Sequence, residues 1–250
     1  MNLFSLEGQV AMVTGCNKGL GQALAVALAE AGADIVGVNR RSAVEIRARV
    51  EALGRTYHSV EAELSHDKES EIVDRALARA GKLDILVNNA GTIRRAPALE
   101  FSEADWDAVV DVNLKAAFFL AQQVARHLVA RGARGKIVNI ASVLSFQGGI
   151  RVPSYTASKS GILGLTRLLA NEWAEHGINV NAIAPGYMAT DNTQALRDDE
   201  QRSAEILGRI PAGRWGEPAD LAGAVIFLCS DAANYVHGHA LAVDGGWLAR

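Results

Sequence analysis

The chain has only two cysteines, Cys16 and Cys229, and their spacing matches neither a metal site nor a disulfide pair. We therefore expect a reducing cytoplasm rather than an oxidising compartment. No apolar run approaches the roughly 18 residues that a membrane-spanning helix needs. The first residues also lack the basic and apolar segments of a secretory signal. The six histidines suggest no ligand set, so no metal site is expected.

The chain also lacks a large excess of either positive or negative charge. The chain has 25 Lys and Arg against 28 Asp and Glu, which gives a net charge of −3. Proteins that bind nucleic acid usually carry a basic surplus, so neither a nucleic acid nor a membrane is an expected partner. What the chain does have is apolar residues, which make up 49% of its 250 positions. That content is enough for one large core.

Short apolar runs alternate with helical patterns along the whole chain. Seven of these runs predict strands, at 9–14, 34–38, 57–61, 83–87, 136–140, 179–184 and 239–243. The runs are continuous, as is typical of parallel strands that are covered on both faces. We therefore predict an α/β fold, a Rossmann-type doubly wound parallel sheet of seven strands with helices on both faces. No linker divides residues 1–250, so we expect a single domain in which the polar stretch 187–214 is a mobile substrate lid.

Three glycines, Gly15, Gly19 and Gly21, follow the first predicted strand. Their spacing is Gly-x3-Gly-x-Gly, which differs from the dinucleotide fingerprint Gly-x-Gly-x-x-Gly. Glycines there could simply form a tight turn. They also permit close approach of a pyrophosphate to the N-terminus of the next helix, where free amides favour an anion. Their place between the first strand and the first helix favours cofactor binding.

Tyr155 and Lys159 are four residues apart in a predicted helix, so they share one face. A phenol has an unperturbed pKa near 10, and a neighbouring ammonium favours the phenolate. This pair therefore suits proton transfer, although an accidental surface pair is the alternative. Ser142 lies thirteen residues before Tyr155. Because Ser142 lacks the Gly-x-Ser-x-Gly elbow, a nucleophilic hydrolase is not favoured.

Together these motifs resemble those of the short-chain dehydrogenase/reductase family, over about residues 7 to 247. They are Thr14-Gly15-x3-Gly19-x-Gly21, Asn88-Asn89-Ala90-Gly91, Asn113, Ser142, Tyr155-x3-Lys159 and Pro185-Gly186. The resemblance implies an NAD- or NADP-dependent oxidoreductase that acts on CH-OH groups. It implies that Tyr155 is the general acid or base, that Lys159 lowers its pKa and holds the cofactor ribose, and that Ser142 polarises the substrate carbonyl. Asn113 would hold a water for proton relay.

The resemblance also implies which residues line the cofactor. They are Gly15, Asn17, Lys18, Gly19, Leu20, Gly21, Asn39, Arg40, Glu63, Leu64, Asn89, Ala90, Gly91, Tyr155, Lys159, Pro185, Gly186, Met188 and Thr190. Asn39 stands where a carboxylate would select NAD, whereas Lys18 and Arg40 could together bind the 2′-phosphate of NADP. Four stretches, 145–155, 184–190, 209–216 and 243–250, resemble a subgroup that is generally NAD-linked. This match places NAD slightly ahead of NADP.

That subgroup acts on six-carbon deoxy or keto sugar acids in uronate and pectin breakdown, such as 2-dehydro-3-deoxy-D-gluconate or 2-deoxy-D-gluconate. The candidate substrate residues are Ser142, Arg94, Arg151 and Tyr187. A guanidinium suits a carboxylate through a bidentate contact, and Arg95 offers a third one. An NADPH-dependent 3-oxoacyl carrier-protein reductase is the alternative, and it leaves Arg94 and Arg151 without a purpose. A non-catalytic NAD(P)-binding scaffold is the alternative of another class.

The family is usually tetrameric, so the resemblance implies a homotetramer. The apolar residues Val109, Val112, Phe118 and Phe119 lie on a predicted helix over 103–131. They could form a contact between subunits or simply cover the sheet.

Overall fold

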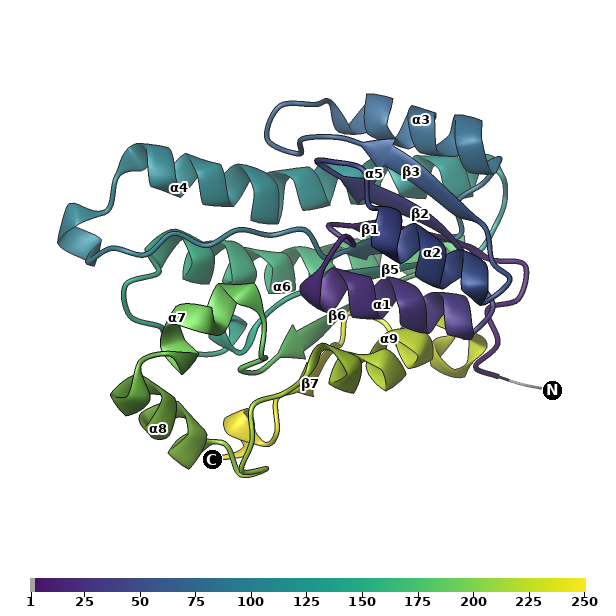
Figure 1. The fold of residues 1–250 in the computed structure, drawn as a ribbon. Coiled ribbons are helices and arrows are strands. Elements are labelled where there is room, and N and C mark those ends of the chain that lie inside the picture. The colour runs from purple at the N-terminus through teal and green to yellow at the C-terminus, as the bar shows by residue number, and fades with distance from the viewer. Residues whose placement is uncertain (1–2) are drawn as a thin grey trace.

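In the computed structural model, which describes residues 3–250, seven strands form one parallel sheet (Figure 1). The strands are β1 (Val10–Thr14), β2 (Asp34–Asn39), β3 (Tyr57–Glu61), β4 (Ile85–Asn88), β5 (Gly135–Ile140), β6 (Ile178–Pro185) and β7 (Ala240–Val243). Their order is β3-β2-β1-β4-β5-β6-β7, which reverses between β1 and β4. This is the doubly wound arrangement that the apolar runs predicted, and each strand boundary lies within two residues of its expected place.

Helices cover both faces of the sheet. One face carries α1 (Gly19–Glu30), α2 (Val44–Ala52) and α9 (Ala222–Cys229), and their buried side chains form one core layer. The opposite layer is formed mainly by α3 (Glu69–Ala80), α5 (Ala116–Ala130) and α6 (Pro153–Trp173). Burial of β1, β4, β5 and β6 along their whole length follows from this double cover. In the described residues, no helix combines the length and the apolar character needed to cross a membrane.

The predicted long helix over 103–131 consists of three segments. Helix α4 (Glu103–Val110) begins at Ser102, whose side chain accepts the N–H of Asp105 at 3.1 Å. A π-helical turn, Asp111–Lys115, follows and leads into α5. Such turns arise where one extra residue is accommodated in a helix, often at functional sites. Here the turn carries Asn113.

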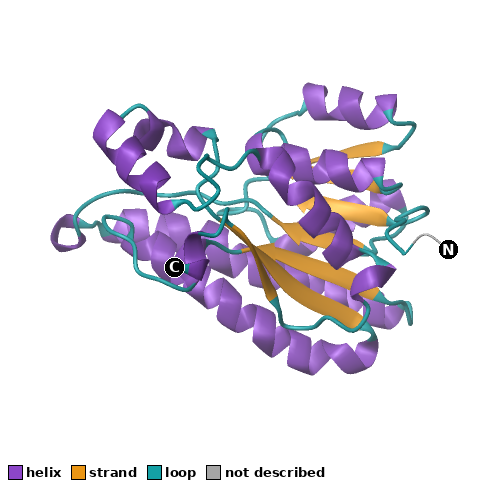
Figure 2. Cartoon of the chain, turned by 90° about the horizontal axis from the view of Figure 1, so that it is seen from below, coloured by secondary structure: helices purple, strands orange, loops and turns teal. Residues whose placement is uncertain are grey.

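The stretch 187–214 is not a plain loop. It contains the short helix α7 (Gln194–Arg197) and helix α8 (Glu200–Arg209), which lie beyond the carboxyl ends of the strands (Figures 1 and 2). Ile206 and Ile210 are buried there with Val143 and Trp247 in a small separate core. The sequence pattern missed these helices because Ile206 alone is buried in α8.

Candidate active site

Helix α6 places Tyr155 and Lys159 on one face, as predicted. The Lys159 ammonium nitrogen lies 5.7 Å from the centre of the Tyr155 ring. It also donates a 2.6 Å hydrogen bond to the backbone carbonyl of Ile140, the last residue of β5. Lys159 is 5% exposed, whereas Tyr155 is half-buried. The pair therefore sits between the helix and the carboxyl end of the sheet.

Ser142 follows the same strand and begins a short 3-10 turn, Val143–Ser145. Its hydroxyl accepts the N–H of Leu144 at 3.1 Å, and it lies near enough to the Tyr155 phenol to lower the pKa of that group. Ser145 fixes this turn to α6, because its hydroxyl accepts the N–H of Ser142 and donates to the carbonyl of Lys159. The structure thus brings Ser142, Tyr155 and Lys159 together.

Burial dominates the electrostatics of these groups. It raises the pKa of Tyr155, against the opposing effects of the Ser142 hydrogen bond and the positive charge of Arg95. It lowers the pKa of Lys159 to about 8. The role that the resemblance implies for Lys159, lowering the pKa of Tyr155, stays a prediction. The Lys159 ammonium is bound to the Ile140 carbonyl, and desolvation of the phenol is the largest influence.

Asn113 connects the loop after β4 to helix α6. Its Oδ1 accepts the N–H of Thr92 at 2.8 Å, and its Nδ2 donates to the Thr92 carbonyl at 2.9 Å. The same Nδ2 donates to the hydroxyl of Ser158 at 3.3 Å. Both amide hydrogens are thereby used, so the side chain positions this loop beside the Tyr155 helix. The water-holding role that the resemblance implies stays a prediction.

The loop between β1 and α1 is folded tightly against residues 89 and 90. The Thr14 hydroxyl accepts the N–H groups of Asn89 and Ala90, and Asn89 Nδ2 donates to the carbonyls of Thr14 and Gly15. A Cβ at Gly21 would lie 2.2 Å from the Gly15 carbonyl oxygen. Only glycine allows this close approach. The motifs Gly15-x3-Gly19-x-Gly21 and Asn89-Ala90 therefore form one unit.

The N-terminus of α1 fits an anionic cofactor group. Its N-cap residue, Lys18, makes no capping hydrogen bond, and the first turn carries no acidic side chain. The free N–H groups of a helix N-terminus would otherwise be satisfied in one of these ways. Gly19 has a φ of +57°, and Thr190 of the predicted lid is near it, since a Cβ at Gly19 would lie 3.9 Å from Thr190 Cγ2. The expected diphosphate thus has an open, favourable helix end.

Asn39 does not face the cofactor side of β2. Its Nδ2 donates to Cys16 Sγ at 3.4 Å and to the Tyr57 hydroxyl at 3.3 Å, and the side chain is buried. Gly37 leaves room for Tyr57, because a Cβ at Gly37 would lie 2.0 Å from that hydroxyl. The cofactor-binding role that the resemblance implies for Asn39 stays a prediction, and the amide of its side chain is already bonded to Cys16 and Tyr57. Its Oδ1 has no hydrogen-bond partner in the structure.

The two predicted phosphate ligands lie apart. Lys18 forms an ion pair with Asp191 of the lid at 2.5 Å. Arg40 is exposed and lies 3.9 Å from the Glu63 carboxylate. Glu63 also accepts a hydrogen bond from Ser65. Arg40 and Arg41 are the basic side chains that directly follow β2, whereas Lys18 is turned toward Asp191.

The remaining predicted cofactor residues frame the same side of the sheet. Gly91 follows β4 and packs against Asn113, since a Cβ there would lie 3.3 Å from Asn113 Oδ1. Pro185 ends β6, and Gly186 is pressed against the backbone of Asp244. The others are placed on the first loop, in the first turn of α1, on the stretch after β3 and on the stretch after β6: Asn17, Leu20, Leu64 and Met188.

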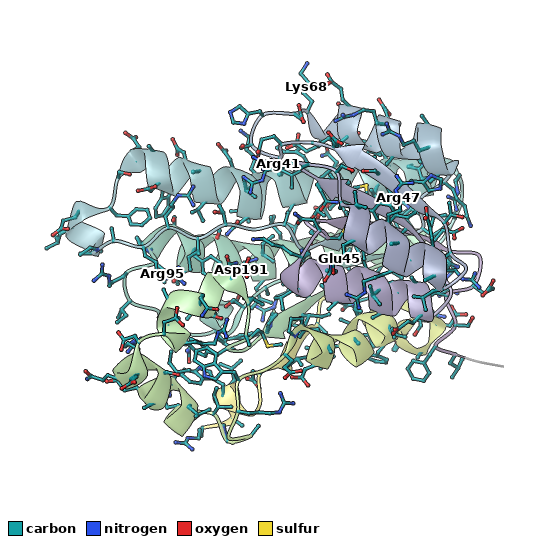
Figure 3. The ribbon with its side chains drawn as sticks, viewed as in Figure 1. Arg41, Glu45, Arg47, Lys68, Arg95 and Asp191 are labelled. Carbon is teal, nitrogen blue, oxygen red and sulfur yellow. The ribbon has the colours of Figure 1, made fainter. Side chains whose placement is uncertain are left out.

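The three arginines have different surroundings. Arg94 is bound to Asp105 at 3.3 Å and to the Thr92 hydroxyl at 2.9 Å. Arg95 donates to the lid carbonyl of Asn192 at 2.9 Å, and its charge acts on Tyr155. Figure 3 shows Arg95 and Asp191 on the same side of the molecule, next to the lid. Arg151 is exposed and has a φ of +63°.

Tyr187, a predicted substrate residue, is part of the lid core. Its ring packs edge-on against Trp215, with 5.7 Å between centroids, and against Trp247 at 4.6 Å. Sequence reasoning also missed Ser145 and Asp191, and it did not assign a cofactor-site role to Thr14. Thr14 gave a signal, because it is a polar residue at the end of an apolar strand. Ser145 and Asp191 gave none, since their partners are distant in the sequence.

Comparisons with known proteins agree with this geometry. The model of the family described as enoyl-(acyl carrier protein) reductase matches residues 15–248. A 2-dehydro-3-deoxy-D-gluconate 5-dehydrogenase from Escherichia coli (strain K12) is 64% identical over 251 residues, covering 100% of this chain and 99% of that protein. Two solved structures are also similar along their whole length.

One is a protein from Agrobacterium tumefaciens with bound NADP, provisionally described as 2-deoxy-D-gluconate 3-dehydrogenase. It is 59% identical with a TM-score of 0.95 and covers 100% of both chains. The other is a gluconate 5-dehydrogenase from Burkholderia cenocepacia J2315 in complex with NADP and tartrate. It is 42% identical with a TM-score of 0.95 and covers 100% of this chain and 98% of that one. These matches show that the chain is an oxidoreductase of the short-chain dehydrogenase/reductase family.

Proposed function

We propose that the protein interconverts the alcohol and ketone forms of a six-carbon sugar acid, with 2-dehydro-3-deoxy-D-gluconate as its substrate. The identity of the E. coli relative supports this substrate. The observation that carries the proposal is the position of Arg95, which reaches the lid while its charge acts on Tyr155. A substrate that reacts at Tyr155 and carries a carboxylate would meet a guanidinium there.

Arg95 suits this role better than the two arginines that the sequence singled out. Arg94 already has the Asp105 carboxylate and the Thr92 hydroxyl as partners. For Arg151 the contact that the structure shows is made by the backbone and not by the side chain, since its carbonyl accepts the N–H of Ala96 at 3.1 Å. This bond fixes the loop that carries Arg95 beside the approach to Tyr155. We therefore assign the carboxylate to Arg95.

The chemistry follows from the placed side chains. Tyr155 donates its proton to the carbonyl oxygen in reduction and takes it back in alcohol oxidation. Ser142, which lies near the phenol, donates to the same oxygen and polarises it. Lys159 fixes the end of β5 and supplies positive charge beside the phenol ring. The nicotinamide supplies or accepts the hydride when the cofactor is bound.

For the cofactor we propose NADP, with Arg40 as the ligand of the 2′-phosphate. The side chain of Asn39 is directed inward, and position 39 carries no carboxylate that would repel a phosphate. Arg40 is exposed beside it. The NADP found in the two related structures agrees, and the preference for NAD drawn from the sequence is not supported.

The proposal is tested by steady-state kinetics on 2-dehydro-3-deoxy-D-gluconate with NAD and with NADP. Arg95→Met is expected to raise the KM of the sugar acid roughly 10- to 100-fold, the loss of a charge-assisted hydrogen-bonded contact. Arg94→Met is the matched control and should change KM less than threefold. Tyr155→Phe should abolish turnover while cofactor binding persists. Turnover of acetoacetyl thioester and not of the sugar acid would refute the assignment in favour of 3-oxoacyl carrier-protein reductase.

We also propose that the protein is a cytoplasmic homotetramer in which 187–214 acts as the substrate lid. Phe119 on α5 and Trp106 on α4 are 37% and 41% exposed, although Val109 is buried and covers the sheet. Exposed aromatic side chains on neighbouring helices suit a contact between subunits. Light scattering on the purified protein measures the assembly. A monomer at micromolar concentration would exclude it.

A further inference from the structure

The lid is attached to the glycine loop by one ion pair. Lys18 lies immediately before α1, and its ammonium lies 2.5 Å from the Asp191 carboxylate. Both side chains are largely exposed, at 70% and 75%. The Lys18 hydrogen bond holds the pKa of Asp191 below its usual range, so this carboxylate is charged at neutral pH. The pair therefore joins the lid to the residue that immediately precedes the free N-terminus of α1.

The lid segment that carries Asp191 is a rigid turn. Thr190 and Thr193 cap the 3-10 turn Asp191–Thr193 reciprocally. The Thr193 hydroxyl also donates to the carbonyl of Met188 at 2.6 Å. Because of these hydrogen bonds, Asp191 and the rest of the turn are expected to move together.

The same turn is held from the opposite side by Arg95, which donates to the Asn192 carbonyl. Further back, the lid is fixed at its base, where Gly216 N–H donates to the Tyr187 carbonyl and Ala189 N–H donates to the Gly216 carbonyl. The turn is thus fastened at a base and at two lateral points. Of the two lateral points, the Lys18 contact is the one on the cofactor side.

We propose that the Lys18–Asp191 ion pair is a latch that holds the lid against the glycine loop and so retains the bound cofactor. The inference rests on the proposed function only in requiring that a nicotinamide dinucleotide binds at α1. The latch acts on any such cofactor, because it closes the lid and makes no distinction at the 2′-position. Lys18 is then a lid residue, and recognition of a 2′-phosphate falls to Arg40.

Two opposite expectations separate this latch from a phosphate-binding role of Lys18. If Lys18 bound the 2′-phosphate, removing its competitor Asp191 would tighten NADPH. General electrostatics also predicts tighter binding of NADPH, since the loss of a negative charge favours the binding of any anion. A latch predicts the reverse, weaker retention of both cofactors after Asp191→Asn.

The test measures the dissociation constants and dissociation rates of NADPH and NADH, by cofactor fluorescence, for the full-length protein. Lys18→Met and Asp191→Asn are each expected to speed dissociation of both cofactors roughly three- to fivefold, as for the loss of one exposed ion pair. The double variant should be no worse than either single one, because both remove the same interaction. Lys68→Met, which removes an exposed lysine elsewhere, is the charge-matched control and should have no effect.

Trypsin cleavage gives a second readout that does not depend on activity. Arg197, Arg202 and Arg209 lie in the lid, so bound cofactor should slow cleavage there in the wild type and much less in either variant. Tighter NADPH binding by Asp191→Asn, or an effect of Lys18→Met on NADPH alone, would overturn the latch. Failure of the wild type to bind either cofactor would refute the proposed function itself.

Discussion

The hydroxyl of Ser145 donates a 2.6 Å hydrogen bond to the backbone carbonyl of Lys159. Through this bond, the turn that carries Ser142 is tied to the helix that carries Tyr155 and Lys159. Ser145→Ala should lower kcat about tenfold because Ser142 loses its orientation. Unfolding should become about 1 kcal/mol easier, since the Lys159 carbonyl loses its donor. Ser145→Thr retains the hydroxyl and should recover most of kcat. An unchanged kcat in Ser145→Ala would show that Ser142 is positioned without it.

Gly21→Ala tests the close packing of the first loop. The added Cβ would lie 2.2 Å from the Gly15 carbonyl oxygen and 2.4 Å from Asn89 Nδ2, so the backbone must move. We expect a loss of about 3 kcal/mol of stability, together with loss of cofactor binding. Gly164→Ala is the control, because α6 has open space there. It should stabilise the protein by about 0.5–1 kcal/mol. Thermal and chemical unfolding measure both.

Lys159→Met should change how the stability of the protein depends on pH. The pKa of Lys159 is lowered from 10.5 to about 8 because burial penalises its charged form. Between these values the unfolded chain binds the proton more tightly than the folded one. The free energy of unfolding of the wild type is thus reduced below pH 8, and it rises again as the pH increases toward 10.5. The recovery amounts to about 3 kcal/mol, and the variant should lack it. Urea unfolding at several pH values checks this; equal slopes for both proteins would contradict it.

Arg151→Gly examines the one residue other than glycine, among those described, that has a positive φ. The left-handed conformation costs a side-chain-bearing residue about 1–2 kcal/mol. Relief of this strain should stabilise the protein by up to about 1 kcal/mol, after the entropic cost of glycine. Arg151→Ala removes the same guanidinium without relieving the strain. Since we assign the substrate carboxylate to Arg95, both variants should keep the KM of the sugar acid. A parallel rise of KM in both would return that role to Arg151.

The sequence predicted what depends on local periodicity. Buried runs such as that of β1, and the four-residue spacing of Tyr155 and Lys159, are read from neighbouring positions and were confirmed. The glycine loop was also placed correctly, because its glycines follow a strand and precede a helix. These features need no knowledge of distant contacts.

The direction in which a side chain points could not be predicted from local periodicity. Arg94 and Arg95 are adjacent, and only Asp105 and Asn192, from different elements, decide which side chain faces the site. Helix α8 was missed because its one buried residue, Ile206, belongs to a core with Trp247, which lies 41 residues later in the chain. The pKa of Tyr155 likewise depends on burial that no local pattern reports.

The inward side chain of Asn39 limits how this protein could be re-engineered. Exchanging it for aspartate is the simplest change by which a designer would seek NAD selectivity, since the carboxylate would be meant for the ribose. Here the new carboxylate would be buried between Cys16 and Tyr57, both of which have raised pKa values because of burial. The charge would then be desolvated between two groups that are themselves kept neutral by burial. A change of cofactor preference in this chain therefore has to start from Arg40, with position 39 left as it is.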